Sequence, residues 1–104
     1  MTTVHVLSQA ALRIDEIYQY SRGQWGDAQA LVYARGLFRA IEQLGVQTAP
    51  SRPIPAKFGV AGYYFRYEKH FVYWRYLANG DVGIFTVLHE RMHQVHRLRR
   101  DFGA

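Results

Sequence analysis

The sequence predicts one α+β domain, spanning residues 1–104, in which a hairpin of two helices packs on a mainly antiparallel sheet. Two observations support this fold class. The first half of the chain carries apolar residues at spacings of three and four, which is typical of amphipathic helices. From Gly62 onward the chain carries short aromatic and β-branched runs, which favour strands. The expected order is strand, two helices and three strands, followed by a basic C-terminal tail.

The first expected element is a short β-branched strand around Val4 and Val6. Ser8 follows it and is predicted to be a helix N-cap, because its hydroxyl can accept a hydrogen bond from a first-turn amide. The helix that follows carries one buried stripe, made of Ala10, Ile14, Ile17, Tyr18 and Ser21.

A second amphipathic helix is predicted after a short turn. Gly23 and Gly26 are expected to end the first helix and Asp27 to cap the second. Trp25 is predicted to pack between the two helices at this turn. The second stripe comprises Ala30, Ala34, Leu37, Ile41 and Leu44. Two such helices joined by a short turn form an antiparallel hairpin.

Three prolines then indicate a connector that is neither helix nor inner strand: Pro50, Pro53 and Pro55. Beyond it, strands are predicted at residues 63–67, 71–77 and 82–88. Asn79-Gly80 between the last two favours a hairpin turn, because both residues tolerate positive φ.

The middle strand is apolar on both faces. Phe71, Tyr73 and Leu77 lie on one face, and Val72, Trp74 and Tyr76 lie on the other. A strand of this kind is central and covered on both sides. The helices can cover one side, and the residues alone leave open what covers the other.

Charge is distributed unevenly along the chain, whose net charge is +5. Residues 1–50 are balanced, whereas residues 51–104 hold nine Lys and Arg against four Asp and Glu. A basic half attracts nucleic acid or an acidic protein segment, or it forms a solvated face that aids solubility.

The composition indicates the cellular compartment in which the protein is expected. The chain has no cysteine, so it can form neither a disulfide framework nor a thiolate metal site, which fits a reducing compartment. The N-terminus shows no secretory pattern, and no apolar run approaches the roughly 20 residues of a membrane span. We therefore expect a cytoplasmic protein that makes no membrane contact.

Four strings of residues, in order along the chain, resemble the ParE branch of the RelE/ParE toxin superfamily. They are Leu7 and Ala11 with Asp15, Ile17 and Tyr18; Trp25-Gly26-Asp27-Ala28-Gln29-Ala30 with Tyr33; His70-Phe71-Val72-Tyr73-Trp74-Arg75; and Val87-Leu88-His89 with Met92. The chain departs from the pattern at His93, where the family often has Asp, and in its more basic tail.

The resemblance implies a type II toxin that poisons DNA gyrase, arrests growth and is neutralised by a cognate antitoxin in a hetero-oligomer. It implies neither a catalytic residue nor a metal or other cofactor. The antitoxin would lie across the strands and cover their second face, and the expected contacts are Arg66, Val72, Trp74, Arg75 and Tyr76. The charge asymmetry places the target contacts at the end of the last strand and in the tail, at His89, Arg91, Met92, Arg97, Arg99 and Arg100.

Other classes of function stay open. The first is a RelE-type ribonuclease that cuts messenger RNA on the ribosome, which would gather Arg66, Lys69, Arg75, His89 and Arg91 on one sheet face, beside aromatic side chains that stack bases. The second is a non-toxic interaction module.

Residues 89–93 also spell a zinc-peptidase motif, His89-Glu90-Arg91-Met92-His93. The motif begins directly after a predicted strand, and the tail offers no third ligand, so no metal is expected. His70 is predicted to be a structural hydrogen-bonding residue.

Overall fold

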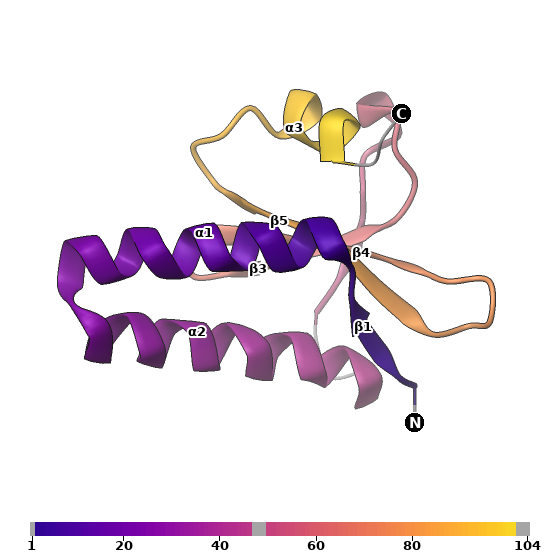
Figure 1. Cartoon of the computed structure of the whole chain (residues 1–104). Helices are drawn as coiled ribbons and strands as arrows, with labels where there is room; N and C mark the ends of the chain where they lie inside the picture. Colours follow the sequence, from indigo (N-terminus) through magenta and orange to yellow (C-terminus); the bar gives the residue numbers. More distant parts are fainter. Residues whose placement is uncertain (1, 47–49, 102–104) are drawn as a thin grey trace.

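A five-stranded sheet forms the middle layer of the molecule (Figure 1). The computed structural model describes residues 2–46 and 50–101. The strands are β1 (Val4–Val6), β2 (Arg52–Pro53), β3 (Tyr63–Tyr67), β4 (His70–Tyr76) and β5 (Val82–His89), in the order β1-β5-β4-β3-β2. β1 runs parallel to β5 and the other pairings are antiparallel, so the predicted sheet is confirmed.

The predicted helical hairpin is also present. It consists of α1 (Ser8–Trp25) and α2 (Asp27–Glu42), and a 3-10 turn, η1 (Gln43–Val46), follows. Gly26 joins the helices at φ 89°, a left-handed conformation that favours glycine. Gly23 lies inside α1, so it does not end that helix.

The predicted caps and the predicted latch at the turn are wrong. Ser8 and Asp27 are the first helical residues, and neither helix has a side-chain cap. Trp25 is 63% exposed and packs edge-on against Tyr20 of its own helix. The tight turn leaves this ring outside the seam between the helices.

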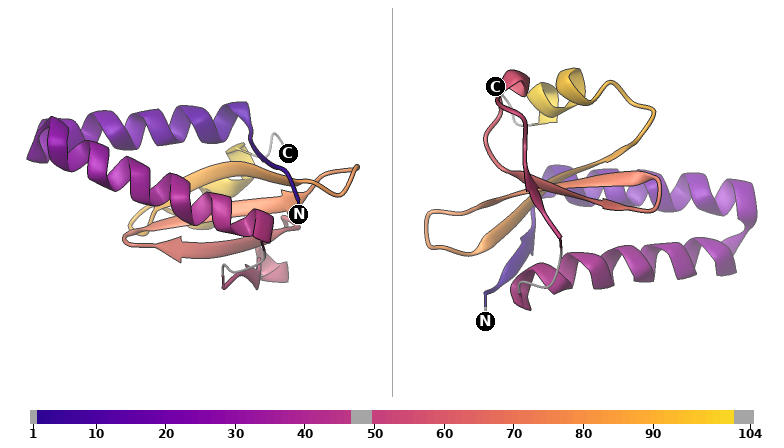
Figure 2. Two further views of the ribbon diagram at one scale, coloured as in Figure 1. Left: turned by 90° about the horizontal axis from the view of Figure 1, so that it is seen from below. Right: turned by 180° about the vertical axis from the view of Figure 1, so that it is seen from behind.

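The hairpin covers one face of the sheet and encloses the larger core (Figure 2). Val72 and Trp74 of β4 lie in this core with Ile84 and Val87 of β5. The helices contribute Ala10, Ile14, Leu37 and Ile41.

A second layer covers part of the opposite face, and it is built by the chain itself. It consists of a 3-10 turn, η2 (Ala56–Phe58), and α3 (Gln94–Asp101), which lie side by side (Figure 1). Leu98 of α3 is fully buried beside Tyr73, Phe85 and Leu88. The basic tail is thus a docked helix, which corrects the expectation that only a partner protein covers this face.

A β-bulge shapes the face under α3. Tyr73 of β4 lies opposite Thr86 of β5, and the next residue, Trp74, lies opposite Ile84. Phe85 therefore has no direct partner. Such an extra residue lets two consecutive side chains project from the same face. Phe85 joins the core under α3, and Thr86 bonds to Asp101 of α3.

The connector and the last hairpin are confirmed in outline. The proline-rich segment crosses from the helices to the sheet and adds an edge strand, β2, that was not predicted. Gly80 has φ 88° in the turn between β4 and β5, and the Leu77 amide donates to the Asp81 carbonyl. Within the described ranges, every helix is too short or too polar to cross a bilayer.

Candidate binding surfaces

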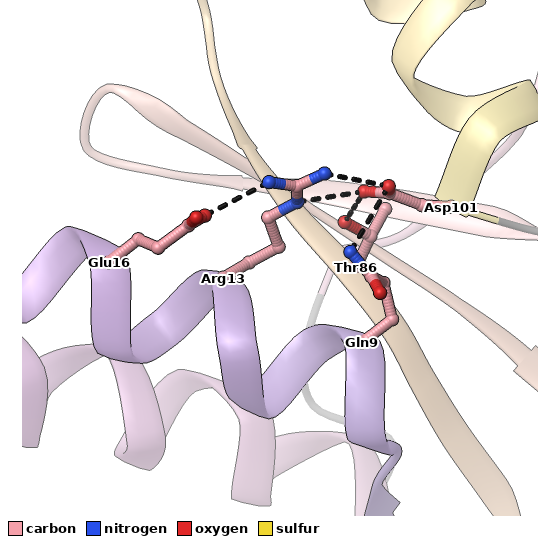
Figure 3. A network of polar contacts seen from close by, with 5 residues as sticks. All are labelled: Gln9, Arg13, Glu16, Thr86 and Asp101. Atoms are coloured by element: carbon pink, nitrogen blue, oxygen red, sulfur yellow. Dashed lines mark hydrogen bonds and ion pairs between the residues drawn. The ribbon is translucent and has the colours of Figure 1, made fainter.

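Asp101 anchors α3 to the rest of the molecule (Figure 3). Its carboxylate accepts hydrogen bonds from Arg13 Nη2 at 2.8 Å and Nε at 3.0 Å, and from the Thr86 hydroxyl at 2.6 Å. Gln9 donates a longer bond of 3.3 Å. The side chains of Asp101 and Arg13 are 3% and 11% exposed, so this ion pair is largely removed from water.

The electrostatics of the pair follow from this geometry. Burial alone would raise the pKa of Asp101, but the bonds from Arg13 and Thr86 outweigh burial and hold that pKa below its ordinary value. The Asp101 carboxylate likewise raises the pKa of Arg13 against the opposing effect of burial. Both groups are therefore charged at neutral pH.

Two further contacts hold the second layer in place. The Tyr73 hydroxyl donates to Gln94 Oε1 at 2.6 Å, and Arg99 Nε donates to the Phe58 carbonyl at 3.1 Å. Arg99, predicted to contact a target, therefore joins α3 to η2. Sequence reasoning missed Asp101, Arg13 and Thr86, and no local pattern marks them as partners.

The other predicted target contacts fall into two groups. His89 ends β5 and is half-buried, whereas Arg91 and Met92 are exposed in the turn that follows. On α3, Arg100 is exposed and Arg97 is half-buried. The exposed members therefore occupy one segment, residues 91–100, which we call the turn–α3 segment.

The predicted antitoxin contacts are divided between the core and the surface. Val72 and Trp74 are 0% and 6% exposed beneath the helical hairpin, so they offer no surface to a partner. The alternating pattern identifies two faces of β4 but does not say which one the helices cover. Arg66, Arg75 and Tyr76 are exposed. Arg66 forms an ion pair with Glu90, in which Arg66 Nη2 donates to the two carboxylate oxygens at 2.9 and 3.0 Å.

An open groove of about 930 Å³ lies at the β2 end of the sheet and includes two of these exposed residues. We call it the sheet-end groove; Ile54, Val60, Tyr63, Arg75 and Tyr76 are among its lining residues. Tyr63 stacks on Trp74 at 4.7 Å, and Tyr76 meets both rings edge-on. Tyr76 is 55% exposed, so the cluster meets solvent at this ring, whereas Trp74 is buried.

A second groove, of about 400 Å³, lies between the helices of the hairpin. We call it the hairpin groove; it is lined by Val6, Ala11, Ile14, Asp15, Tyr18, Ala34 and Phe38. Phe38 is 41% exposed there. Both grooves expose apolar side chains, which a polypeptide partner can bury.

Two of the four cations in the ribonuclease alternative, Arg66 and Arg75, lie on the opposite face of the sheet from its histidine, His89. Arg66 lies over Phe71 and Arg75 over Phe85, on the side that α3 covers. The His89 ring packs against His70, which faces α2. Arg75 and His70 are also five residues apart on β4, or roughly 17 Å along the strand. The sheet therefore separates the proposed base from these cations.

The zinc-peptidase motif does not lie on a helix. His89 ends β5, and His93 immediately precedes α3, where its Nδ1 accepts a bond from the His96 amide at 3.2 Å. Among the described residues, no three His, Asp or Glu side chains are grouped as metal ligands.

His70 is a buried hydrogen-bonding residue, as predicted. Its Nδ1 lies 2.6 Å from the Tyr33 hydroxyl of α2. Burial, reinforced by His89, lowers the pKa of His70 to about 4, and burial raises the pKa of Tyr33 to about 12. Both groups are thus neutral at pH 7, and the hydroxyl can donate to the imidazole.

The fold and its grooves define a small α+β protein with open apolar surfaces suited to polypeptide partners. A family model described as "ParE toxin of type II toxin-antitoxin system, parDE" matches residues 4–94. The chain therefore belongs to the ParE toxin family and is the toxin component of a two-protein toxin–antitoxin system.

Comparison with solved structures agrees on the fold. A chain from a structure titled "Chromosomal ParDE TA system from P. aeruginosa" superposes with a TM-score of 0.67 at 18% identity. The match covers 86% of this chain and 96% of that one. No curated protein matches the sequence.

Proposed function

We propose that this chain inhibits DNA gyrase in the cytoplasm and is silenced by a cognate ParD antitoxin that binds in its open grooves. The observation that carries the proposal is the family match over residues 4–94. The grooves support it physically, because they leave apolar surface that a toxin held in a complex would bury. Arg91 and Met92, which are exposed in the turn that precedes α3, provide the surface for the target.

The sheet-end groove is our proposed main antitoxin site. The exposed Tyr76 belongs to an aromatic cluster with Tyr63 and Trp74, and such rings supply large contact area at low entropic cost. Arg75 lines the same groove and adds a cation for an acidic side chain of the partner. The antitoxin contacts predicted from the sequence thus reduce here to Arg75 and Tyr76.

Replacing Tyr76 by alanine is expected to weaken antitoxin binding by at least about 30-fold, corresponding to about 2 kcal/mol for an aromatic anchor. Phe38→Ala, in the hairpin groove, is the matched control because it removes an aromatic ring of similar exposure. Titration calorimetry with purified ParD measures both. A larger loss in the Phe38 variant would move the main antitoxin site to the hairpin groove.

Gyrase inhibition is tested directly with the purified protein, gyrase and supercoiled plasmid. The expected result is accumulation of cleaved DNA that depends on the toxin and disappears when ParD is added. A parallel reaction with programmed ribosomes tests the ribonuclease alternative. Cut messenger with no cleaved plasmid would contradict the proposal and restore that alternative.

Met92→Ala and Arg91→Gln together test the turn as a target contact. Both side chains are exposed, so the variant should fold normally and still bind ParD. We expect at least a tenfold loss of gyrase inhibition, about 1.4 kcal/mol of binding energy. Unchanged inhibition would remove the turn from the target surface.

A further inference from the structure

α3 presents a cationic outer face. Leu98, Gln94 and Asp101 point inward, to the core, to Tyr73 and to Arg13 respectively. With 3.6 residues per turn, residues away from this inward side form a stripe at spacings of one and three. This stripe, the α3 outer face, consists of His96, Arg97 and Arg100, and His93 of the preceding turn lies beside His96.

Arg100 is the more accessible cation of this face. Arg100 is exposed and Arg97 is half-buried, and neither is within ion-pair distance of a described carboxylate. Arg97 nevertheless lies close enough to Asp101 for its charge to help lower the pKa of that carboxyl. The Arg99 bond to the Phe58 carbonyl holds η2, which carries the exposed Lys57, beside α3. Asp101 is the acidic residue of α3, and it is turned inward to Arg13.

The chemistry of the face favours a polyanion over a protein. Protein interfaces are built around apolar and aromatic anchors and are depleted of charge at their centre. The α3 outer face has no such anchor, whereas the two grooves do. Phosphate recognition, by contrast, needs little beyond exposed cations on a rigid element. α3 is rigid because Asp101, Gln94 and Leu98 fix it to the sheet.

We propose that the α3 outer face, with Lys57, binds the phosphate backbone of duplex DNA. The choice of DNA rests on the proposed function, since a gyrase inhibitor acts where gyrase holds DNA. No aromatic ring other than imidazole lies on the face, so unpaired bases would find no large stacking platform there. The contact would be independent of sequence, because it reaches phosphates and no base edges.

The test is binding of the purified toxin, without gyrase, to a fluorescently labelled 20-base-pair duplex, followed by anisotropy at several salt concentrations. Arg97→Gln with Arg100→Gln should reduce the log–log salt slope by about 2 and weaken binding at 0.1 M salt by roughly 60-fold, since each phosphate contact contributes a slope of about 0.9. Arg100→Gln alone should show about half the change in slope.

The matched control is Arg35→Gln with Arg39→Gln. These two exposed arginines lie on α2, on the other side of the sheet, and their loss lowers net charge by the same amount. We expect this control to bind DNA nearly as tightly as the native protein. Circular dichroism and urea unfolding establish that both double variants are folded.

Several outcomes would overturn the inference. These are no duplex binding by the native protein, equal losses in the two double variants, tighter binding to duplex RNA, and binding to a polyglutamate peptide in place of DNA. Because gyrase is absent from the assay, its outcome is separate from that of the plasmid-cleavage test. Specific duplex binding by a protein that fails to inhibit gyrase would support this inference and contradict the proposed function.

Discussion

Replacing Asp101 by alanine is expected to reduce the free energy of unfolding by about 3 kcal/mol, and the melting temperature by roughly 15 °C. The substitution removes the carboxylate that Arg13 and the fully buried Thr86 share. Arg13 would keep Glu16, an exposed partner, but would lose its buried one. Breaking one side of a buried pair is costly because the remaining charge has left water without compensation.

The loss should be concentrated in the second layer. Without Asp101, α3 keeps Leu98 and the Gln94–Tyr73 bond but loses its attachment to α1. We therefore expect amide hydrogen exchange to quicken most in residues 94–101, while β4 and β5 stay protected. Urea unfolding measures the overall change and exchange locates it.

Two variants serve as controls for this prediction. Glu16→Ala removes the other partner of Arg13, but the Glu16 side chain is 55% exposed, so the cost should stay below about 1 kcal/mol. Arg13→Leu combined with Asp101→Leu removes both charges and should recover part of the loss. A cost for Asp101→Ala no greater than that for Glu16→Ala would contradict the structural role of the pair.

Lowering the pH from 7 to 4 is expected to reduce stability by about 3 kcal/mol through His70 alone. Burial lowers its pKa from 6.5 to about 4 in the folded protein. Between these values the unfolded chain takes up a proton that the folded chain does not. The stability that neutral His70 provides is therefore present above pH 6.5, declines as the pH falls, and is lost below about pH 4.

His70→Gln isolates this effect. The glutamine can still accept a bond from Tyr33 but does not titrate, so the variant should show a much smaller decline between pH 6.5 and 4. Asp101 stays ionised in the folded protein across this pH range, because its pKa lies below the ordinary value of 3.8. It therefore does not account for a difference in slope between the two proteins. Urea unfolding of both proteins across this range gives the two slopes. Equal slopes would show that His70 is not the responsible group.

The helical hairpin and the three main strands could be predicted from the sequence because their signals are local. Apolar residues at spacings of three and four predicted α1 and α2, and aromatic and β-branched runs predicted β3, β4 and β5. α3 could not be found in this way. It has one fully buried side chain, Leu98, among charged neighbours, and its main polar anchor, Arg13, lies 88 residues away in sequence.

The candidate surfaces were less predictable than the fold, and for a related reason. Alternation along β4 separates Val72 and Trp74 from Tyr73 but does not identify the face that packs on the helices. Arg99 also resembles its neighbours in sequence, yet it binds the Phe58 carbonyl across the second layer. Tyr76 and Arg75, expected to contact the antitoxin, are exposed at the end of β4, and their role as contacts stays a prediction.

The parallel pairing of β1 with β5 bears on how the toxin is made in the cell. Val4, near the start of the chain, pairs with Val82, and the larger core needs residues from both halves. Contacts between distant parts of a chain form slowly, and a ribosome releases the early part first. A nascent chain therefore has to emerge at least through β5 before the toxin can assemble, which gives an antitoxin already present in the cell time to meet it.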